Sequence, residues 1–252
     1  MMWTLPHRGL ILLLSTVLGC LFVGVLTLAL GESHAAVILL DRKTTMLPYP
    51  WTIQNLMHVL FFIGLGELFV RWRAAEYEHA FLRRGFLPPD GHNIVLQSHD
   101  LGKIRHVVKG RYDGDHGFLP YLIDLCILQF HAGHSVDQVV SVLNNALDLI
   151  SHRVDLRYSM LRYLVWLIPT VGFIGTVLGI SFALKDINPE NPDLQAMTAA
   201  LGMAFYTTLV ALVQSAVLVL LLHLTQSREE LAVSDSGGMV LRNLINRLYT
   251  AG

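Results

Sequence analysis

Four long apolar stretches constrain this chain more than any other feature of its sequence. A helix needs about 20 predominantly apolar residues to cross a bilayer, and the segments 9–30, 51–70, 163–184 and 197–224 meet that requirement. The composition agrees, because 53% of the 252 residues are hydrophobic and only 15% are charged. The sequence therefore predicts an all-α, polytopic membrane protein with four transmembrane helices.

The first apolar stretch also has the charged start of a secretory signal, since Arg8 precedes it. Its apolar run is longer than the core of a typical signal peptide, and residues 31–35 form a weak cleavage site. We therefore expect a retained transmembrane helix.

The basic residues predict the orientation. Of the 18 Lys and Arg residues, only Arg42, Lys43 and Lys185 lie in the loops after the first and third spans. Positive residues near span ends favour the cytoplasm, so both termini and the segment between the second and third spans are predicted to be cytoplasmic. The net charge of −1 argues against a nucleic-acid partner.

These boundaries predict four parts. They are an N-terminal transmembrane hairpin (1–70), a helical cytoplasmic domain (71–162), a second transmembrane hairpin (163–224) and a cytoplasmic tail (225–252). Within the tail, Ser234 to Gly238 is expected to be a flexible break before a short amphipathic helix.

The cytoplasmic segment has clear helix boundaries. Pro88 to Gly91 predicts a break, and 112–117 predicts a loop. Ser135 and Gln138 have the spacing of a capping box. After them, apolar residues recur every three or four positions and predict a packing seam. The seam comprises Val136, Val140, Leu143, Leu147, Ile150 and Val154.

The third span carries Pro169 and three small residues, Gly172, Gly175 and Gly179, with the hydroxyl of Thr176 at its centre. Small residues let helices approach closely in lipid, where van der Waals packing drives association. This pattern predicts a helix that packs tightly against neighbouring helices and belongs to an assembly.

The fourth span adds the polar side chains of Tyr206, Thr207 and Thr208. Threonines in membrane helices often bond their own backbone, but Thr176 and Thr208 both lie near mid-depth on adjacent spans. These two threonines, together with Thr207 and Tyr206, are candidates for an ion path. Neither span has a carboxylate at that depth, so any conducted ion is expected to need a carboxylate from a partner.

Two titratable residues occur in the second span. Glu67 lies four residues before Arg71, so an ion pair reaching the surface is favoured over a transport role. His58 lies nearer the middle of the helix, where intramembrane titratable groups are often functional, although a packing role is favoured.

The order and spacing of these motifs resemble a known family. Ile168 to Ile180 resembles the proline, glycine and glycine-threonine signature of the MotA/TolQ/ExbB proton-channel family, and Phe205 to Leu212 resembles its fourth-span threonine motif. The large segment before the third span also fits, and four spans resemble the arrangement of flagellar stators.

The resemblance implies a homopentamer in the bacterial inner membrane around two copies of a single-span partner similar to MotB, TolR or ExbD. In that family an aspartate of the partner carries the ion, and the complex converts ion flow into mechanical work. Thr176 and Thr208 would be the pore threonines and Pro169 the third-span proline. The ion would be H⁺ or else Na⁺, with no cofactor.

The chain also departs from the family pattern. Some members have an acid shortly before the fourth-span threonine, where this chain has residues 203–206 without one. It also has no counterpart of the charged torque-generating patch of flagellar stators. These departures put a proton-relay acid and a flagellar role in doubt.

Two other function classes stay open. One is a membrane scaffold or sensor in which the threonines only pack. The other is a membrane enzyme that uses the histidines of the middle segment, but their spacing forms no recognised metal set, so neither a bound metal nor an enzyme is expected. The histidines concerned are His92, His99, His106, His116, His131 and His134.

Overall fold

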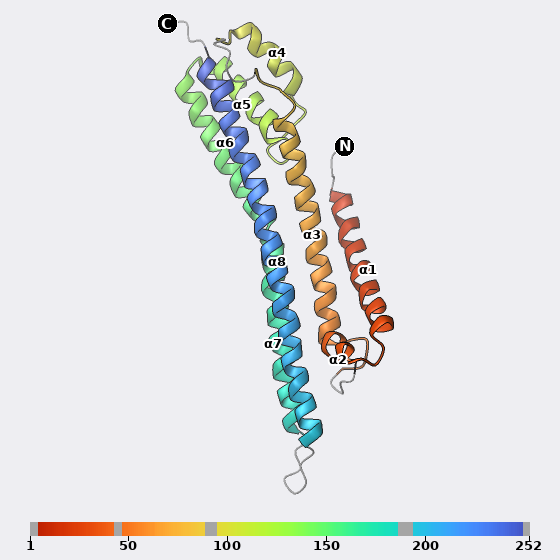
Figure 1. The fold of residues 1–252 in the computed structure, drawn as a ribbon. Coiled ribbons are helices and arrows are strands. Elements are labelled where there is room, and N and C mark those ends of the chain that lie inside the picture. Colours follow the sequence, from red (N-terminus) through yellow and green to blue (C-terminus); the bar gives the residue numbers. More distant parts are fainter. Residues whose placement is uncertain (1–4, 43–46, 89–94, 186–193, 249–252) are drawn as a thin grey trace. The chain divides into compact units, whose positions relative to one another are not determined.

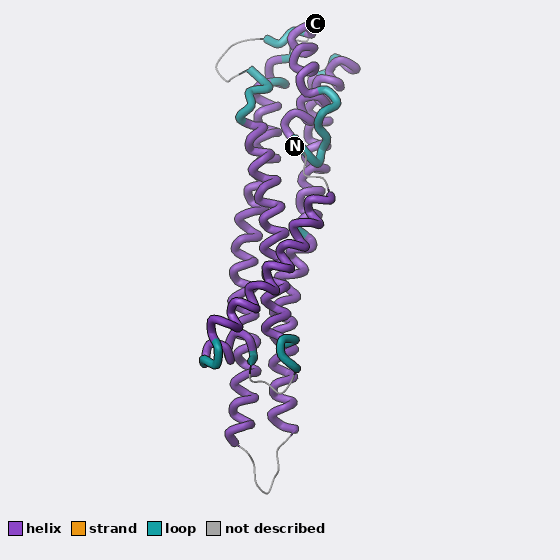
Figure 2. Tube along the Cα trace, turned by 90° about the vertical axis from the view of Figure 1, so that its right-hand side faces the viewer, coloured by secondary structure: helices purple, strands orange, loops and turns teal. Residues whose placement is uncertain are grey.

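The computed structural model describes residues 5–42, 47–88, 95–185 and 194–248 (Figure 1). The regular secondary structure of these residues is helical, and Figure 2 shows helices joined by loops, with no strand in the described part. The helices are α1 (Leu5–Leu30), α2 (His34–Leu40), α3 (Ile53–Leu82), α4 (Ser98–Val108), α5 (Phe118–Gly133), α6 (Val136–Arg157), α7 (Ser159–Lys185), α8 (Leu194–Asn243) and the 3₁₀ helix η1 (Ile245–Arg247).

Four helical stretches are long and apolar enough to cross a membrane, as the sequence predicts. They include α1, α3, α7 and α8. The fold class, all-α with four membrane-spanning helices, is therefore confirmed.

The chain divides into two compact units, which are described separately. Unit 1 comprises residues 1–70 and 160–223, and unit 2 comprises residues 71–159 and 224–252. Residues 89–91, within the break predicted from Pro88 to Gly91, lie outside the described residues, as do residues 186–193 between the predicted third and fourth spans.

Unit 1 contains α1, α2 and the apolar parts of α3, α7 and α8. The long helices α7 and α8 run side by side in opposite directions (Figures 1 and 2). Many large apolar side chains face outward, as expected where the surroundings are lipid or other apolar helices. On α7 and α8 they include Phe173, Val177, Phe205, Leu209, Val213 and Leu220.

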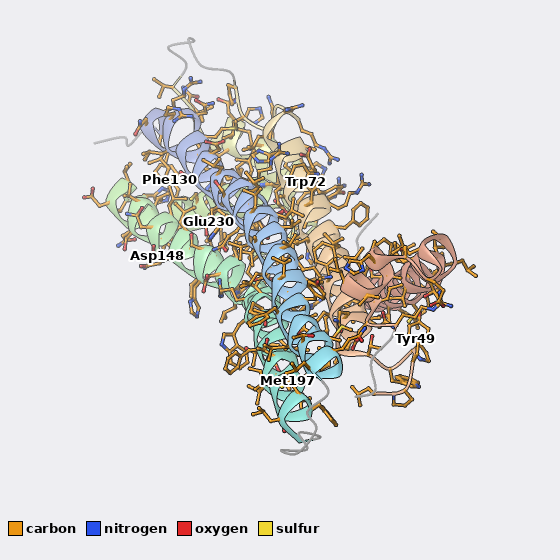
Figure 3. All side chains as sticks on the ribbon, turned by 60° about the horizontal axis from the view of Figure 1, so that its bottom comes forward. Tyr49, Trp72, Phe130, Asp148, Met197 and Glu230 are labelled. Carbon is orange, nitrogen blue, oxygen red and sulfur yellow. The ribbon has the colours of Figure 1, made fainter. Side chains whose placement is uncertain are left out.

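The connection between α2 and α3 is tied to both helices. At the other end of α2, before the helix begins, the side-chain oxygen of Ser33 accepts a hydrogen bond from the Ala36 N–H and caps it. The Thr52 hydroxyl donates to the Leu40 carbonyl at 3.0 Å. Tyr49, labelled in Figure 3, lies in this connection and its hydroxyl contacts that of Thr27 on α1.

Unit 2 is built around α5, which packs against α4 and α6. The predicted cap of α6 is present, because the Ser135 hydroxyl accepts a hydrogen bond from the Gln138 N–H. The core side chains contributed by α5 are Phe118, Leu119, Leu122, Ile123, Cys126, Ile127 and Phe130.

The buried face of α6 is rotated from the predicted seam. Leu143, Ile150 and Val154 are buried as expected, but Val139 and Ala146 complete the face. Val136, Val140 and Leu147 are only half-buried. Val139 and Val140 both fit the apolar spacing of the helix. Only the position of the neighbouring helices determines which of the two is buried.

The predicted break at Ser234 to Gly238 is wrong, because α8 continues through it to Asn243. A side chain at Gly237 would meet Leu147 of α6, whose Cδ1 lies 2.7 Å from the position of an added Cβ. The Ser236 hydroxyl donates to the Ala232 carbonyl within the same helix. These small residues serve close packing inside a helix instead of ending it.

Candidate functional site

Helices α7 and α8 approach closely at two of the three predicted glycines. A Cβ added to Gly172 would lie 2.4 Å from Cβ of Ala211, and one added to Gly175 would lie 2.9–3.0 Å from side-chain atoms of Thr207. Carbon atoms ordinarily pack at about 3.5–4.0 Å. Both glycines thus face α8 of the same chain, whereas the sequence suggested packing within an assembly. Gly179 is buried as well.

Pro169 removes one backbone hydrogen bond from α7, and a side chain of α8 replaces it. Proline lacks an N–H, so the carbonyl four residues earlier loses its helical hydrogen-bond donor. That carbonyl belongs to Val165, and it accepts a hydrogen bond from the Ser215 hydroxyl of α8 at 3.0 Å. The side chain from the neighbouring helix replaces the missing donor, as a low-dielectric environment requires.

The threonines predicted on adjacent spans meet between α7 and α8. The hydroxyls of Thr176 and Thr208 are hydrogen-bonded to each other. The Thr176 hydroxyl oxygen also lies 3.0 Å from the Ala204 carbonyl oxygen, and that of Thr208 lies 3.2 Å from the Gly172 carbonyl oxygen. Whichever hydroxyl accepts in the mutual hydrogen bond is free to donate to its carbonyl. Because Gly172 has no side chain, hydroxyls from both α7 and α8 can reach its carbonyl oxygen. We call Thr176, Thr207, Thr208 and Gly172 the threonine cluster.

Members of the threonine cluster differ in exposure. Thr207 is buried, with 3% of its surface exposed, and donates to the Ala204 carbonyl at 2.7 Å. Thr176 and Thr208 are half-buried, so part of each residue is exposed. Tyr206 is also half-buried. Thr207 therefore fills the space above Gly175, while Thr176 and Thr208 are the less buried threonines of the cluster.

An exposed aromatic pair fixes the depth of the threonine cluster along α7. Tyr163 and Trp166 are 51% and 61% exposed, and their ring centroids lie 6.0 Å apart. Such rings favour the membrane–water boundary. Thr176 follows Trp166 by ten residues, or about 15 Å at the rise of an α-helix, which is half of a hydrocarbon core of about 30 Å.

Glu67 has a partner that the sequence did not suggest. Its carboxylate binds Arg8 of α1, with O–N distances of 2.9 and 3.0 Å, and its side chain is only 1% exposed. The predicted pair with Arg71 would have reached the surface, whereas the Glu67 carboxylate is buried against α1. The partner lies 59 positions earlier in the chain, so helical spacing could not identify it.

His58 is buried in unit 1, with 5% exposed. One ring nitrogen, Nε2, lies 2.9 Å from the Leu39 carbonyl, and the other, Nδ1, lies 2.7 Å from Nε2 of Gln214 on α8. Phe22 of α1 packs edge-on to the ring, with centroids 5.6 Å apart. These partners satisfy both ring nitrogens and fit the packing role that was favoured.

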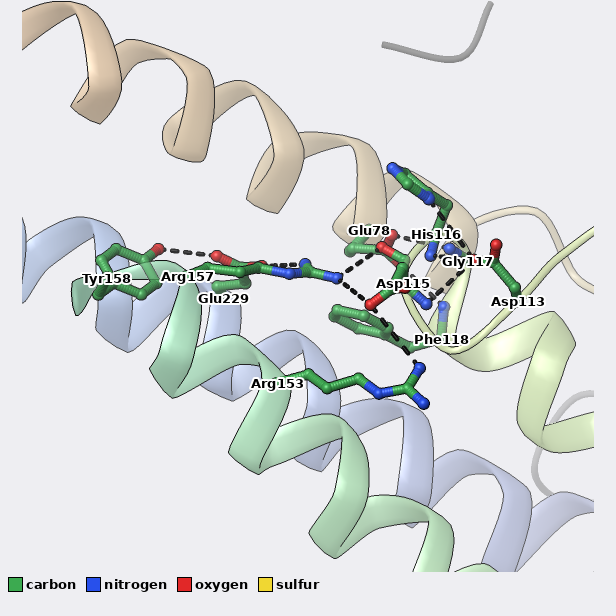
Figure 4. Close-up of polar contacts among 10 residues, drawn as sticks. All are labelled: Glu78, Asp113, Asp115, His116, Gly117, Phe118, Arg153, Arg157, Tyr158 and Glu229. Carbon is green, nitrogen blue, oxygen red and sulfur yellow. Dashed lines mark hydrogen bonds and ion pairs between the residues drawn. The ribbon is translucent and has the colours of Figure 1, made fainter. Parts of the chain in front are cut away.

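Unit 2 contains a second polar cluster, shown in Figure 4. The Glu78 carboxylate of α3 accepts hydrogen bonds from the backbone N–H groups of Gly117 and Phe118, both at 2.8 Å. Gly117 has a φ of +83°, which favours glycine. A carboxylate at a helix N-terminus is stabilised by the helix dipole, so Glu78 anchors the start of α5.

Arg157 and Glu229 form the centre of this polar cluster (Figure 4). Arg157 donates to the fully buried Glu229 carboxylate at 2.8 Å and to that of Asp115 at 2.9 Å. The second oxygen of Glu229 accepts a hydrogen bond from the Tyr158 hydroxyl at 2.8 Å. Burial raises the pKa of Tyr158, so this hydroxyl stays protonated and donates. Buried charges are tolerated only when paired in this way.

Few features of the sequence predict these contacts. From the sequence, Ser215 is recognisable only as a hydroxyl on the span that follows the Pro169 span. Gln214 is recognisable only as a polar residue in an apolar span. Arg157, Tyr158 and Glu229 show no shared motif. In the described residues, no group of three or more His, Cys, Asp or Glu side chains is placed to hold a metal ion.

Together, these features define a class of protein: a multi-pass helical membrane protein with a hydroxyl-lined, acid-free contact between two adjacent spans. Residues 120–235 match the MotA/TolQ/ExbB proton channel family, which confirms the resemblance seen in the motifs. The match includes α6, α7 and the part of α8 that carries Thr207 and Thr208. No curated protein and no solved structure matched the chain.

Proposed function

We propose that this chain is the pore-wall subunit of an ion-driven, energy-transducing complex in the bacterial inner membrane. The observation that carries the proposal is the hydrogen-bonded pair of half-buried threonines, Thr176 and Thr208, at mid-depth of spans that match a proton-channel family. Their mutual hydrogen bond fixes both oxygens in one place. Such oxygens can donate to or accept from a passing ion carrier.

The carrier itself comes from a partner. The spans 163–184 and 197–223 contain no Asp or Glu, and a bare ion at mid-depth needs a charged or well-coordinated site. A single-span protein similar to MotB, TolR or ExbD would supply an aspartate there. It would receive hydrogen bonds from Thr176 and Thr208 as it is loaded and unloaded, with H⁺ as the ion, or alternatively Na⁺.

Assembly follows the family plan, a homopentamer around two copies of that partner. In support, α7 and α8 present large apolar side chains outward, such as Phe173 and Phe205, both at least 60% exposed. The glycines do not carry this assembly in our proposal, because Gly172 and Gly175 pack within one chain. With this topology, both termini and the segment 71–162 are cytoplasmic.

Individual residues then have separate roles. Thr176 and Thr208 face the ion carrier, and Tyr206 lies beside them on the half-exposed side of α8. Thr207, Pro169 and the glycines hold the two helices together. Glu67 is neutralised by Arg8 and stays outside the ion path.

Valine substitution tests the proposal. Thr176→Val and Thr208→Val keep the β-branched shape but remove the hydroxyl, so each should abolish ion-coupled activity in proteoliposomes that contain the complex. Thr198→Val is the matched control, because the Thr198 hydroxyl only bonds the backbone of its own helix, at 2.8 Å from the Leu194 carbonyl.

Assembly must be measured in the same samples by native mass spectrometry. Loss of activity with an intact complex supports the proposal. Full activity in both variants would instead favour a membrane scaffold or sensor, in which the threonines only pack. The chain without its partner should pass neither H⁺ nor Na⁺ above background, and selective conduction by the chain alone would contradict the assigned role of the partner.

A further inference from the structure

The buried pair of His58 and Gln214 links three elements of unit 1. His58 projects from α3, its Nε2 meets the carbonyl of Leu39 on α2, and its Nδ1 meets the amide of Gln214 on α8. Gln214 is 8% exposed. The pair belongs to neither the threonine cluster nor the Arg8–Glu67 ion pair.

The hydrogen-bond partners determine which ring nitrogen carries the proton. A carbonyl oxygen only accepts, so Nε2 of His58 must donate to Leu39. The Gln214 amide nitrogen only donates, so Nδ1 must accept from it. The arrangement therefore holds a neutral imidazole whose free lone pair, on Nδ1, already receives a hydrogen bond.

In this state the oxygen of the Gln214 side-chain amide makes no hydrogen bond with the described residues. This Oε1 atom is buried, and a buried acceptor without a hydrogen bond ordinarily costs free energy. If the amide rotates by half a turn, Oε1 takes the place of Nε2 and faces Nδ1. An acceptor there is favourable only when Nδ1 carries a proton.

We propose that His58 and Gln214 form a proton-binding site in unit 1. One proton, delivered by a hydronium ion that becomes water, forms an N–H bond at Nδ1 of His58. The Gln214 amide turns and its Oε1 accepts that N–H, while Nε2 continues to donate to Leu39. The imidazolium thus has two hydrogen-bond acceptors from two other elements, and this inference does not depend on the role of the threonine cluster.

The other charged or titratable groups of the neighbouring elements enter the test because each can alter the proton affinity of His58. On α3 and α1, Glu67 and Arg8 neutralise each other. Among the side chains that the structure describes, those on α1, α2 with its cap, α3 and α8 within unit 1 are Arg8, Cys20, His34, Asp41, Glu67, Tyr206 and His223.

Nitrogen-15 NMR of histidine-labelled protein in lipid nanodiscs tests the site. At high pH the His58 signals should show Nδ1 without a proton and Nε2 with one. When the pH is lowered through the range in which histidines titrate, Nδ1 should become protonated and the Gln214 side-chain signal should move at the same midpoint. The His58 signals are assigned by their loss in His58→Asn. If that variant does not fold, they are assigned by their contact with the Phe22 ring.

Two variants of Gln214 should shift the midpoint in opposite directions. Gln214→Met cannot accept a hydrogen bond and should lower the proton affinity of His58 about tenfold, since hydrogen bonds to charged groups are stronger than neutral ones. Gln214→Glu places a carboxylate there and should raise the affinity at least about tenfold.

Gln226→Met is the matched control, because Gln226 lies on the same helix and binds the exposed Glu230 at 2.8 Å. It should leave the midpoint unchanged. A His58 signal with the proton on Nδ1 at high pH, or a midpoint that none of the Gln214 variants moves, would overturn the proposal.

Discussion

Replacing Gly172 by alanine adds one methyl group at the closest approach of α7 and α8. The new Cβ would lie 2.4 Å from Cβ of Ala211 and 3.3 Å from the Thr207 carbonyl oxygen. Since carbon atoms pack at about 3.5–4.0 Å, the helices must separate by more than about 1 Å. Overpacking of this kind typically costs about 1–3 kcal/mol, and it would also pull Thr208 from the Gly172 carbonyl.

The expected loss can be measured as a lower midpoint of thermal unfolding in detergent. Gly202→Ala is the control on α8, because its Cβ would meet only Tyr206, at 4.0 Å. The double variant Gly172→Ala/Ala211→Gly removes the methyl group that causes the clash. It should recover part of the loss, even though a glycine within a helix costs about 1 kcal/mol.

Equal midpoints for Gly172→Ala and Gly202→Ala would refute this reasoning. So would a double variant whose loss is the sum of the two single losses, because independent sites add whereas residues in contact do not. Either result would mean that Gly172 does not determine the distance between α7 and α8.

Two further predictions concern buried polar groups. Burial raises the pKa of the Glu78 carboxyl above its usual value of 4.5, so just above that pH the folded chain keeps a proton that the unfolded chain has lost. The stability of unit 2 should therefore fall as the pH rises above 4.5. Glu78→Gln should remove this pH dependence, and the unfolding of unit 2 can be measured by thiol labelling of the buried Cys126. Ser215→Ala should lower stability by about 1–3 kcal/mol because it leaves the Val165 carbonyl without a donor. The loss should be smaller in a Pro169→Ala background, which restores the helical N–H at residue 169. An equal loss in both backgrounds would contradict the assigned role of Ser215.

Local pattern was sufficient for much of the fold. The four spans follow from the length and apolarity of their segments, the start of α6 from Ser135, and the loop before α5 from residues 112–117. The pairing of Thr176 with Thr208 also follows from sequence, because a short loop makes two spans antiparallel neighbours and equal depth brings the residues together.

Contacts between distant segments could not be predicted in the same way. Glu67 meets Arg8, because two helices cross there, and no periodicity connects residues 59 positions apart. Residues 234–238 favour a break by composition, yet packing against Leu147 holds Gly237 in a continuous helix. Tertiary burial outweighs the local preference of a few small residues.

The sequence by itself determined that this chain is a four-span helical protein whose third and fourth spans carry hydroxyls and no acid. Only the tertiary structure decided which threonine is buried and which two meet, since the rotation of α8 buries Thr207 against Gly175 and leaves Thr208 beside Thr176. The physical reason is that hydrophobic and polar patterns act along one helix, whereas exposure depends on which atoms of a second helix lie opposite.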